Sequence, residues 1–119
     1  MRPDCFQEVK LMKMIRAIIR PEKGSEVEKA LRDNGFPALT IMDVYGRGRQ
    51  MGIHIGNVFY DELPKQMFLI VVEDEDEEVV SKIIMEHAVT GDTGNFGDGR
   101  IFVTDVLKTY TVSTRSEDL

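Results

Sequence analysis

Four apolar runs, separated by two stretches of helical character, constrain the fold of this chain more than any other feature. The runs are rich in β-branched and aromatic residues, as strands are, and they cover residues 13–20, 40–45, 66–73 and 100–106. Apolar residues recur at helical spacing after the first run and after the third. This order predicts a βαββαβ ferredoxin-like α+β fold, with both helices on one face of an antiparallel sheet. The other face of so small a sheet also needs cover, which oligomerisation often provides.

Local signals predict where the two helices begin and end. Ser25 followed by Glu28 predicts a capping box at the start of the first helix. Asn34 and Gly35 predict its end, because glycine takes the left-handed conformation after a helix without a steric penalty. The second helix is predicted over residues 76–89, with a buried stripe that consists of Val79, Val80, Ile83, Ile84 and Ala88.

The length of 119 residues fits a single domain. Residues 1–11 precede the regular pattern and are interpreted as an N-terminal extension, residues 12–114 as the domain, and residues 115–119 as a polar tail. Residues 46–64 contain four glycines and no clean period, which predicts a long, exposed and mobile loop. A short extra strand is expected within residues 108–114.

The composition excludes several classes of partner. The formal net charge is −6, and six acidic residues follow one another at 73–78. This acidic run is interpreted as a solvated helix start, or else as a patch for a metal or a basic partner. Nucleic acid is not expected as a partner, because phosphate binding requires a basic face. No apolar run reaches the roughly 18 residues of a membrane span, and the single cysteine, Cys5, fits a reducing cytoplasm.

Two glycine-rich segments are candidate binding loops: "GRGRQMG" at 46–52 and "TGDTGNFGDGR" at 90–100. Neither matches a phosphate-binding P-loop or a dinucleotide fingerprint, because the spacing and the following elements are wrong. The second segment leaves two interpretations open. It is a simple helix–strand connection, or its backbone N–H groups form an anion site with Arg100 at the exit.

Four segments in order resemble the PII family of nitrogen-signalling proteins: "MKMIRAIIRP", "VYGRGRQMG", "LPKQMFLIVVEDED" and "TGNFGDGRIFV". The resemblance runs from Met12 to about Thr114. It implies a trimer of ferredoxin-like subunits, with ATP or ADP in the clefts between adjacent subunits. Two loops would hold the phosphates: the base of the long T-loop after the second strand, and the glycine-rich B-loop before the fourth.

The resemblance also implies residues for the nucleotide site. The T-loop base would be Gly46, Arg47, Gly48, Arg49 and Gln50, the B-loop would be Phe96, Gly97, Asp98, Gly99 and Arg100, and the adenosine would lie against Ile18, Thr40 and Val71. Arg100 stands where the family usually has lysine. Both side chains are cationic, so Arg100 can still pair with a phosphate, through the forked donors of its guanidinium.

A second ligand, 2-oxoglutarate, is implied beside the nucleotide. By resemblance, Gln50 completes the site of a magnesium ion that joins the keto acid to the nucleotide, and Lys65 pairs with the distal carboxylate. An ammonium facing a carboxylate favours a dicarboxylate over neutral metabolites. Without the resemblance, Lys65 would be interpreted as a solvated lysine at the start of a strand.

The chain departs from the family pattern in three places. The T-loop is shorter than in enterobacterial-type members and has no tyrosine at its tip, and Tyr60 does not match the residue that those members modify. The C-terminal arginines that usually reach a neighbour's phosphates are replaced by Thr111 and Ser113, with Arg115 two positions later as a candidate substitute. Extra residues stand in the B-loop region around 90–92.

The short T-loop and "YDELPK" are most similar to PII proteins that nitrogen-fixation operons of methanogens and anaerobes encode in pairs. That resemblance implies a homotrimer or a mixed hexamer with a paralogue. It also implies binding to the dinitrogenase component of nitrogenase, which would block the enzyme when nitrogen is plentiful. ATP together with 2-oxoglutarate would release it.

The sequence bears on three other functions. An enzyme is not expected, because the sequence shows no base or acid organised around His54 or His87, and two histidines with one cysteine make a poor zinc set. A trimeric scaffold without nucleotide, like the cation-tolerance proteins, is a second possibility. An ammonium-transporter regulator is a third: Arg47 or Arg49 would enter the pore, although the short loop argues against plugging.

Overall fold

The computed structural model describes residues 11–47, 53–55, 58–60 and 62–117, and of the segments 53–55 and 58–60 it describes only the backbone. Its centre is a four-stranded sheet in the order β2-β5-β1-β6, in which every neighbouring pair is antiparallel. These strands are β1 (Met12–Ile19), β2 (Thr40–Gly46), β5 (Leu63–Glu73) and β6 (Gly99–Val106). Strand β1 is therefore central, paired along its length with β5 on one side and β6 on the other.

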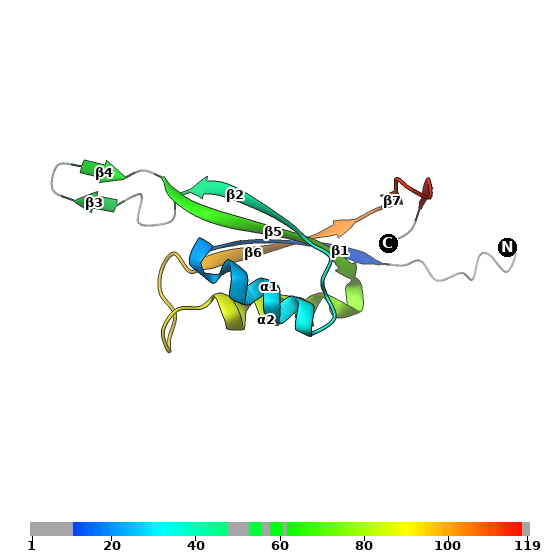
Figure 1. The fold of residues 1–119 in the computed structure, drawn as a ribbon, viewed down its shortest axis with the longest axis horizontal. Coiled ribbons are helices and arrows are strands. Elements are labelled where there is room, and N and C mark those ends of the chain that lie inside the picture. The colour runs from blue at the N-terminus through cyan, green and yellow to red at the C-terminus, as the bar shows by residue number, and fades with distance from the viewer. Residues whose placement is uncertain (1–10, 48–52, 56–57, 61, 118–119) are drawn as a thin grey trace, which may run out of the picture.

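Two helices, α1 (Gly24–Asp33) and α2 (Glu77–Ala88), lie side by side on one face of this sheet (Figure 1). Each follows a one-turn 3₁₀ helix, η2 (Pro21–Lys23) or η3 (Asp74–Asp76). The predicted ferredoxin-like α+β fold is confirmed. In the described part of the chain, neither helix is long and apolar enough to cross a membrane.

Two small hairpins extend the sheet at opposite ends (Figure 1). Strands β3 (Ile53–Ile55) and β4 (Val58–Tyr60) pair within the predicted long loop, beyond the ends of β2 and β5. Strands β7 (Tyr110–Thr111) and β8 (Ser116–Glu117) pair near the C-terminus. The predicted extra strand thus exists, but its partner lies in the segment that was predicted to be only a polar tail.

The core lies between the sheet and the two helices. It consists mainly of Ile15, Ala17, Ile19, Phe68, Ile70 and Val72 from the sheet, and Val27, Leu31, Val80 and Ile84 from the helices. On β1 and β5 the buried side chains alternate with partly exposed ones, as expected for strands covered on one face.

The predicted capping box at Ser25 is wrong, because α1 begins one residue earlier and has no side-chain cap. The 3₁₀ turn before the helix replaces the cap: the Lys23 N–H donates to the Arg20 carbonyl at 3.0 Å, and the Gly24 N–H donates to the Pro21 carbonyl. Gly24, at the first helical position, leaves room for the Gln66 side chain, whose Oε1 lies 1.9 Å from where a Cβ would stand.

The predicted end of α1 is confirmed. Gly35 has φ +91°, and its N–H donates to the Arg32 carbonyl at 3.1 Å. The N–H of Phe36 donates to the Leu31 carbonyl at 2.8 Å, which completes a Schellman motif. The helix therefore ends where its unpaired carbonyls find these two donors.

The predicted buried stripe of α2 is wrong at one position. Val80, Ile83, Ile84 and Ala88 are buried, whereas the Val79 side chain is 51% exposed. Ser81 takes the place of Val79 on the inner face and is buried there. It is accommodated because its hydroxyl donates to Glu77 Oε2 at 2.8 Å, so no hydroxyl is left without a partner.

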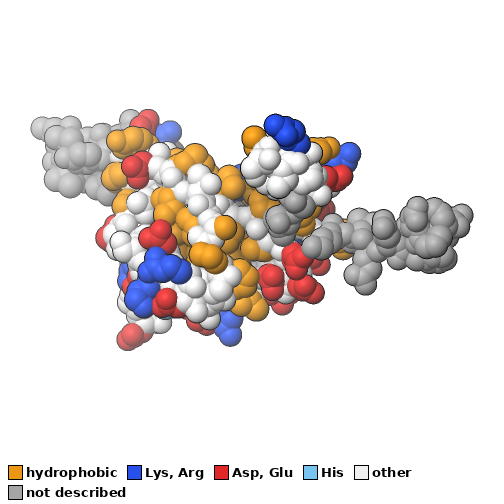
Figure 2. All heavy atoms as spheres, turned by 45° about the vertical axis from the view of Figure 1, so that its right-hand side comes forward, with side chains coloured by type: hydrophobic (Ala, Val, Ile, Leu, Met, Phe, Trp, Pro, Cys, Tyr) orange, Lys and Arg blue, Asp and Glu red, His pale blue; other side chains and the backbone are white. Residues whose placement is uncertain are grey.

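The sheet face opposite the helices is largely apolar, and neither helix covers it. Residues directly opposite each other in an antiparallel pair share a face, so the register places Leu69, Arg16 and Phe102 in one row and Met42, Met67, Ile18 and Arg100 in the next. Met42 and Phe102 are exposed. Hydrophobic side chains (orange in Figure 2) lie exposed across one side of the molecule, with charged groups around them.

Candidate functional site

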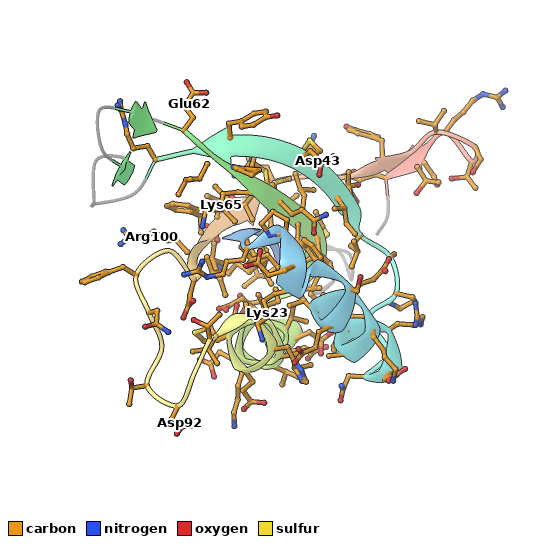
Figure 3. All side chains as sticks on the ribbon, turned by 60° about the vertical axis from the view of Figure 1, so that its left-hand side comes forward. Lys23, Asp43, Glu62, Lys65, Asp92 and Arg100 are labelled. Carbon is orange, nitrogen blue, oxygen red and sulfur yellow. The ribbon has the colours of Figure 1, made fainter. Side chains whose placement is uncertain are left out.

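Three segments meet at one end of the sheet and form the candidate site. They are Arg20 at the end of β1, Lys65 near the start of β5, and residues 89–98, which connect α2 to β6. Figure 3 shows Lys65 and Arg100 at this end, with Asp92 at the far tip of the connecting loop. The antiparallel pairing of β1 with β5 and β6 brings these segments together, because Ile19 pairs with Gln66, the neighbour of Lys65, and with Gly99, which follows the loop.

The carboxylate of Asp98 organises the loop. Its Oδ1 accepts hydrogen bonds from Arg20 Nε at 3.0 Å and from the Thr90 hydroxyl at 2.6 Å. Its Oδ2 accepts from the backbone N–H groups of Thr90, at 3.0 Å, and Asn95, at 2.8 Å. One side chain thus ties both sides of the loop to the end of the central strand.

These donors keep Asp98 ionised. Burial of its carboxylate by itself would raise the pKa, but the hydrogen bonds from Thr90, Asn95 and Arg20 outweigh it and hold the pKa well below the ordinary value of 3.8. The Asp98 side chain is 16% exposed and the Arg20 side chain 27% exposed, so their ion pair is largely shielded from solvent.

Two cations bind consecutive backbone carbonyls of the same loop. Arg20 Nη2 donates to the Phe96 carbonyl at 2.9 Å, and Lys65 Nζ donates to the Gly97 carbonyl at 2.5 Å. Partial burial, together with the nearby charge of Arg20, lowers the pKa of Lys65. Positive charge is thus concentrated beside a glycine backbone, which suits an anionic ligand.

Gly99, at the start of β6, permits the close approach of the loop to β1. Its φ is +133°, and a Cβ there would lie 2.1 Å from the carbonyl oxygen of Ile18. Gly97, with φ +92°, lies against both cations, since a Cβ there would be 3.2 Å from Arg20 Nη2 and 3.7 Å from Lys65 Nζ. The glycines predicted to shape a loop therefore bring backbone and cations into contact.

The other predicted site residues divide into three groups. Ile18, Thr40, Val71 and Arg100 lie on the open face of the sheet by register, with Thr40 and Val71 farther along the strands from the loop. Gly46 is the last residue of β2, where a Cβ would lie 3.8 Å from Lys65 Cγ, and Arg47 follows it. Gly48, Arg49 and Gln50 lie outside the described residues, as do the side chains of His54 and Tyr60.

Metal ligands do not gather in the described ranges, where no group of three or more His, Cys, Asp or Glu side chains could hold an ion. His87 lies instead on α2, where its Nδ1 is 2.9 Å from Glu26 Oε2 of α1. The acidic run at 73–78 begins the 3₁₀ turn and the first turn of α2, as a solvated helix start would.

The sequence patterns did not identify Arg20 as a residue of the site. The residue lies 78 positions from Asp98, and the two meet only because β6 pairs with β1. One available signal was the arginine at the end of the first strand, directly before Pro21, since such an end opens onto a loop.

Comparisons with known proteins agree with this fold. The family model described as nitrogen regulatory protein P-II matches residues 12–116. The chain is 58% identical over 108 residues to nitrogen fixation nifHD region GlnB-like protein 1 of Methanothermobacter marburgensis, covering 91% of this chain and all of the relative. It is 55% identical over 105 residues to the protein of the same description from Methanococcus maripaludis, covering 88% of this chain and 97% of that one.

A solved structure is also similar: Arabidopsis thaliana PII bound to citrate, with a TM-score of 0.72 and 30% sequence identity. The match covers 92% of this chain and 88% of the plant chain. The family model spans residues 12–116, nearly all of the described domain. The chain belongs to the PII family of nitrogen regulatory proteins.

Proposed function

We propose that this protein is a nitrogen signal transducer that binds ATP or ADP together with 2-oxoglutarate and controls nitrogenase by direct binding. The observation that carries the proposal is the contact between the Lys65 ammonium and the glycine loop, at 2.5 Å from the Gly97 carbonyl. A dicarboxylate that pairs with Lys65 would then lie beside the backbone that holds the phosphates. Each ligand would thereby influence the other.

The nucleotide would lie against the open face of the sheet. Ile18, Thr40 and Val71 share that face by register, and Arg100 lies on it beside the loop. This face is also the one that needs cover, so a second subunit would complete the site, in a homotrimer or in a mixed hexamer with a paralogue. Phosphates would meet the loop amides and the Arg100 guanidinium.

A magnesium ion fits the proposed site only when the nucleotide and the keto acid are also bound. Because the described residues offer no cluster of protein carboxylates or histidines for it, most of its oxygen ligands would come from nucleotide and keto acid, with Gln50 completing the set. When bound, the ion would neutralise part of the charge that these two anions bring together. Lys65 orients the keto acid by its distal carboxylate.

The citrate bound to the plant PII supports a polycarboxylate as the second ligand. The relatives from methanogens are described by their place in the nifHD region, which supports a target in nitrogen fixation. The target we propose is the dinitrogenase component, bound when nitrogen is sufficient and released by ATP with 2-oxoglutarate. Release requires that these ligands bind the free form more tightly than the docked form.

Titration calorimetry tests the ligand part of this function. ATP with magnesium should release or absorb heat on binding, and 2-oxoglutarate should bind measurably only once nucleotide is present. Citrate and the neutral dimethyl ester of 2-oxoglutarate serve as matched probes, of which only citrate carries the charge that Lys65 needs. Absence of ATP binding, or equal binding of the ester, would refute the proposal.

Retention on immobilised dinitrogenase component tests the target. The protein should stay bound in buffer alone and elute with ATP plus 2-oxoglutarate, but not with 2-oxoglutarate alone. Retention of the protein on an immobilised ammonium transporter, but not on the dinitrogenase component, would instead favour the other PII role.

A further inference from the structure

We propose that Arg20 and Asp98 are positioning residues for the phosphate-binding loop: their ion pair sets the loop backbone before ligand arrives and offsets the charge of Asp98. This inference rests on the proposed function, and it gives Asp98 a task different from contact with the nucleotide. It also assigns a role to Arg20, which lies at the end of the central strand.

The Asp98 carboxylate has no capacity left for a ligand. A carboxylate offers about four acceptor sites, and four donors from Arg20, Thr90 and Asn95 already occupy them. Asn95 also returns two side-chain hydrogen bonds to Thr90, to its carbonyl at 3.2 Å and to its hydroxyl at 2.9 Å. The carboxylate is thus the centre of a closed network inside the loop.

Arg20 joins this network to the phosphate-binding backbone. Its Nε contacts the Asp98 side chain, and its Nη2 contacts the Phe96 carbonyl. The planar guanidinium fixes the distance between these two groups, which the single ammonium of a lysine does not do. Residues 96–98 are therefore held in one arrangement from the rigid end of β1.

The charge of Arg20 also matters for the ligand. Arg20 and Lys65 both lie beside the loop, and the Asp98 carboxylate offsets part of their positive charge. Loss of the Arg20 charge would leave Asp98 with less compensation, so the attraction of the site for phosphate would weaken. The penalty should grow with the charge of the ligand, and ATP should lose more affinity than ADP.

A double-mutant cycle with nucleotide affinity as the readout tests this role on the full chain. Arg20→Gln and Asp98→Asn should each weaken ATP binding by about tenfold or more, because each breaks a hydrogen bond to a charged group. The double variant should lose far less than the product of the two losses, since either change alone already breaks the pair. Arg20→Lys should recover part of the ATP affinity through its charge. Arg32→Gln, at the far end of α1, is the control for loss of one surface charge.

Two outcomes would overturn the inference. Independent losses that multiply would mean that Arg20 and Asp98 do not act together. Normal or tighter ATP binding by Asp98→Asn would mean that Arg20 contacts phosphate directly. Failure of the wild-type chain to bind ATP would instead refute the proposed function itself.

Amide hydrogen exchange in the ligand-free protein tests the positioning role of the Arg20–Asp98 pair without nucleotide. The N–H groups of Thr90 and Asn95 should exchange faster in Arg20→Gln and in Asp98→Asn than in wild type, while those of β1 keep their rates. Unchanged exchange at both amides would refute the positioning role. If Asp98→Asn fails to fold, the Arg20 variants still decide the question through this exchange and through the ratio of ATP to ADP affinity.

Discussion

Lys65 donates to the Gly97 carbonyl, and its partial burial, followed by the nearby charge of Arg20, lowers its pKa. Its ammonium is therefore held in place at the site before a ligand arrives. A carboxylate that replaces the carbonyl as its partner gains a charge-assisted bond at little cost in side-chain ordering. This is the residue at which we expect metabolite specificity to arise.

Lys65→Ala should abolish the effect of 2-oxoglutarate on nucleotide binding while leaving the oligomer intact. The expected loss of 2-oxoglutarate affinity is about tenfold or more, because a hydrogen bond to a charged group disappears. Calorimetry in the presence of ATP measures it, and size-exclusion chromatography reports the oligomer. Lys82→Ala, on the exposed side of α2, is the control. An undiminished 2-oxoglutarate response in Lys65→Ala would remove this lysine from the site.

Gly99→Ala should lower the free energy of unfolding by roughly 2–5 kcal/mol, through backbone strain and overpacking against Ile18. Gly35→Ala is a matched control, because its φ is also positive but nothing lies within 4 Å of the added Cβ. There the loss should be only roughly 1–2 kcal/mol. Denaturant unfolding measures both, and equal losses would show that the close approach of Gly99 to β1 is unimportant.

At the scale of elements, α1 and α2 are joined across their outer surface as well as through the core. The Glu26 carboxylate of α1 contacts His87 of α2, and this hydrogen bond, with a smaller part from Lys23, lowers the pKa of Glu26 below 4.5. A carboxyl whose pKa is lowered by folding stabilises the folded state above its unfolded pKa. That stabilisation disappears as the pH falls through the lowered value.

Glu26→Gln should therefore lower the thermal unfolding midpoint at pH 6 and have progressively less effect as the pH falls below 4.5. The loss should be small, because the pair is solvent-exposed. Glu28→Gln, an exposed position on the same helix, is the control. A difference between wild type and Glu26→Gln that persists undiminished at pH 3 would contradict the role of the Glu26 charge.

Element order was predictable because hydrophobic periodicity records it, whereas some boundaries depend on the neighbouring strands. Strand β5 begins at Leu63, three residues before its predicted start at residue 66. Pro64 argued against a strand there, because proline cannot donate to a ladder. It is tolerated because β1 pairs with β5 only from Gln66 onward, so the start of β5 has a single neighbour.

The candidate site was predictable only in part. Its glycines and Lys65 stand in recognisable segments, but the Arg20–Asp98 pair depends on strand order and spans 78 positions. Contacts such as the Arg20–Asp98 pair are set by three-dimensional neighbours, which a single sequence does not record. The inner face of α2 was misjudged at Val79 for a different, local reason: Ser81 can be buried because its hydroxyl donates a hydrogen bond to Glu77, one turn earlier in the same helix.

At the scale of the whole molecule, the sheet face opposite the helices is the surface through which we expect the chain to associate. Leu69, Arg16 and Phe102 form a row across its centre, and an apolar face of this kind is typical of subunit interfaces. The proposed nucleotide residues lie on the same face. Assembly and ligand binding would therefore depend on each other.

Phe102→Arg should dissociate the oligomer, because an added charge buried without a partner costs roughly 3–5 kcal/mol at each interface. Light scattering coupled to chromatography measures the mass. Val79→Arg places the same charge at a comparably exposed apolar position on the helical face and should leave the mass unchanged. Nucleotide affinity should fall only in the first variant. An intact oligomer in Phe102→Arg would place the interface elsewhere.

Strand β1, paired on both sides, has Arg20 at its end. A strand hydrogen-bonded along both edges opens only when the whole domain unfolds. Arg20, which directly follows this strand, would therefore keep its contacts with residues 96–98 while less firmly held segments fluctuate. A metabolite could then shift the β3–β4 hairpin between conformations while the loop that holds the phosphates stays fixed.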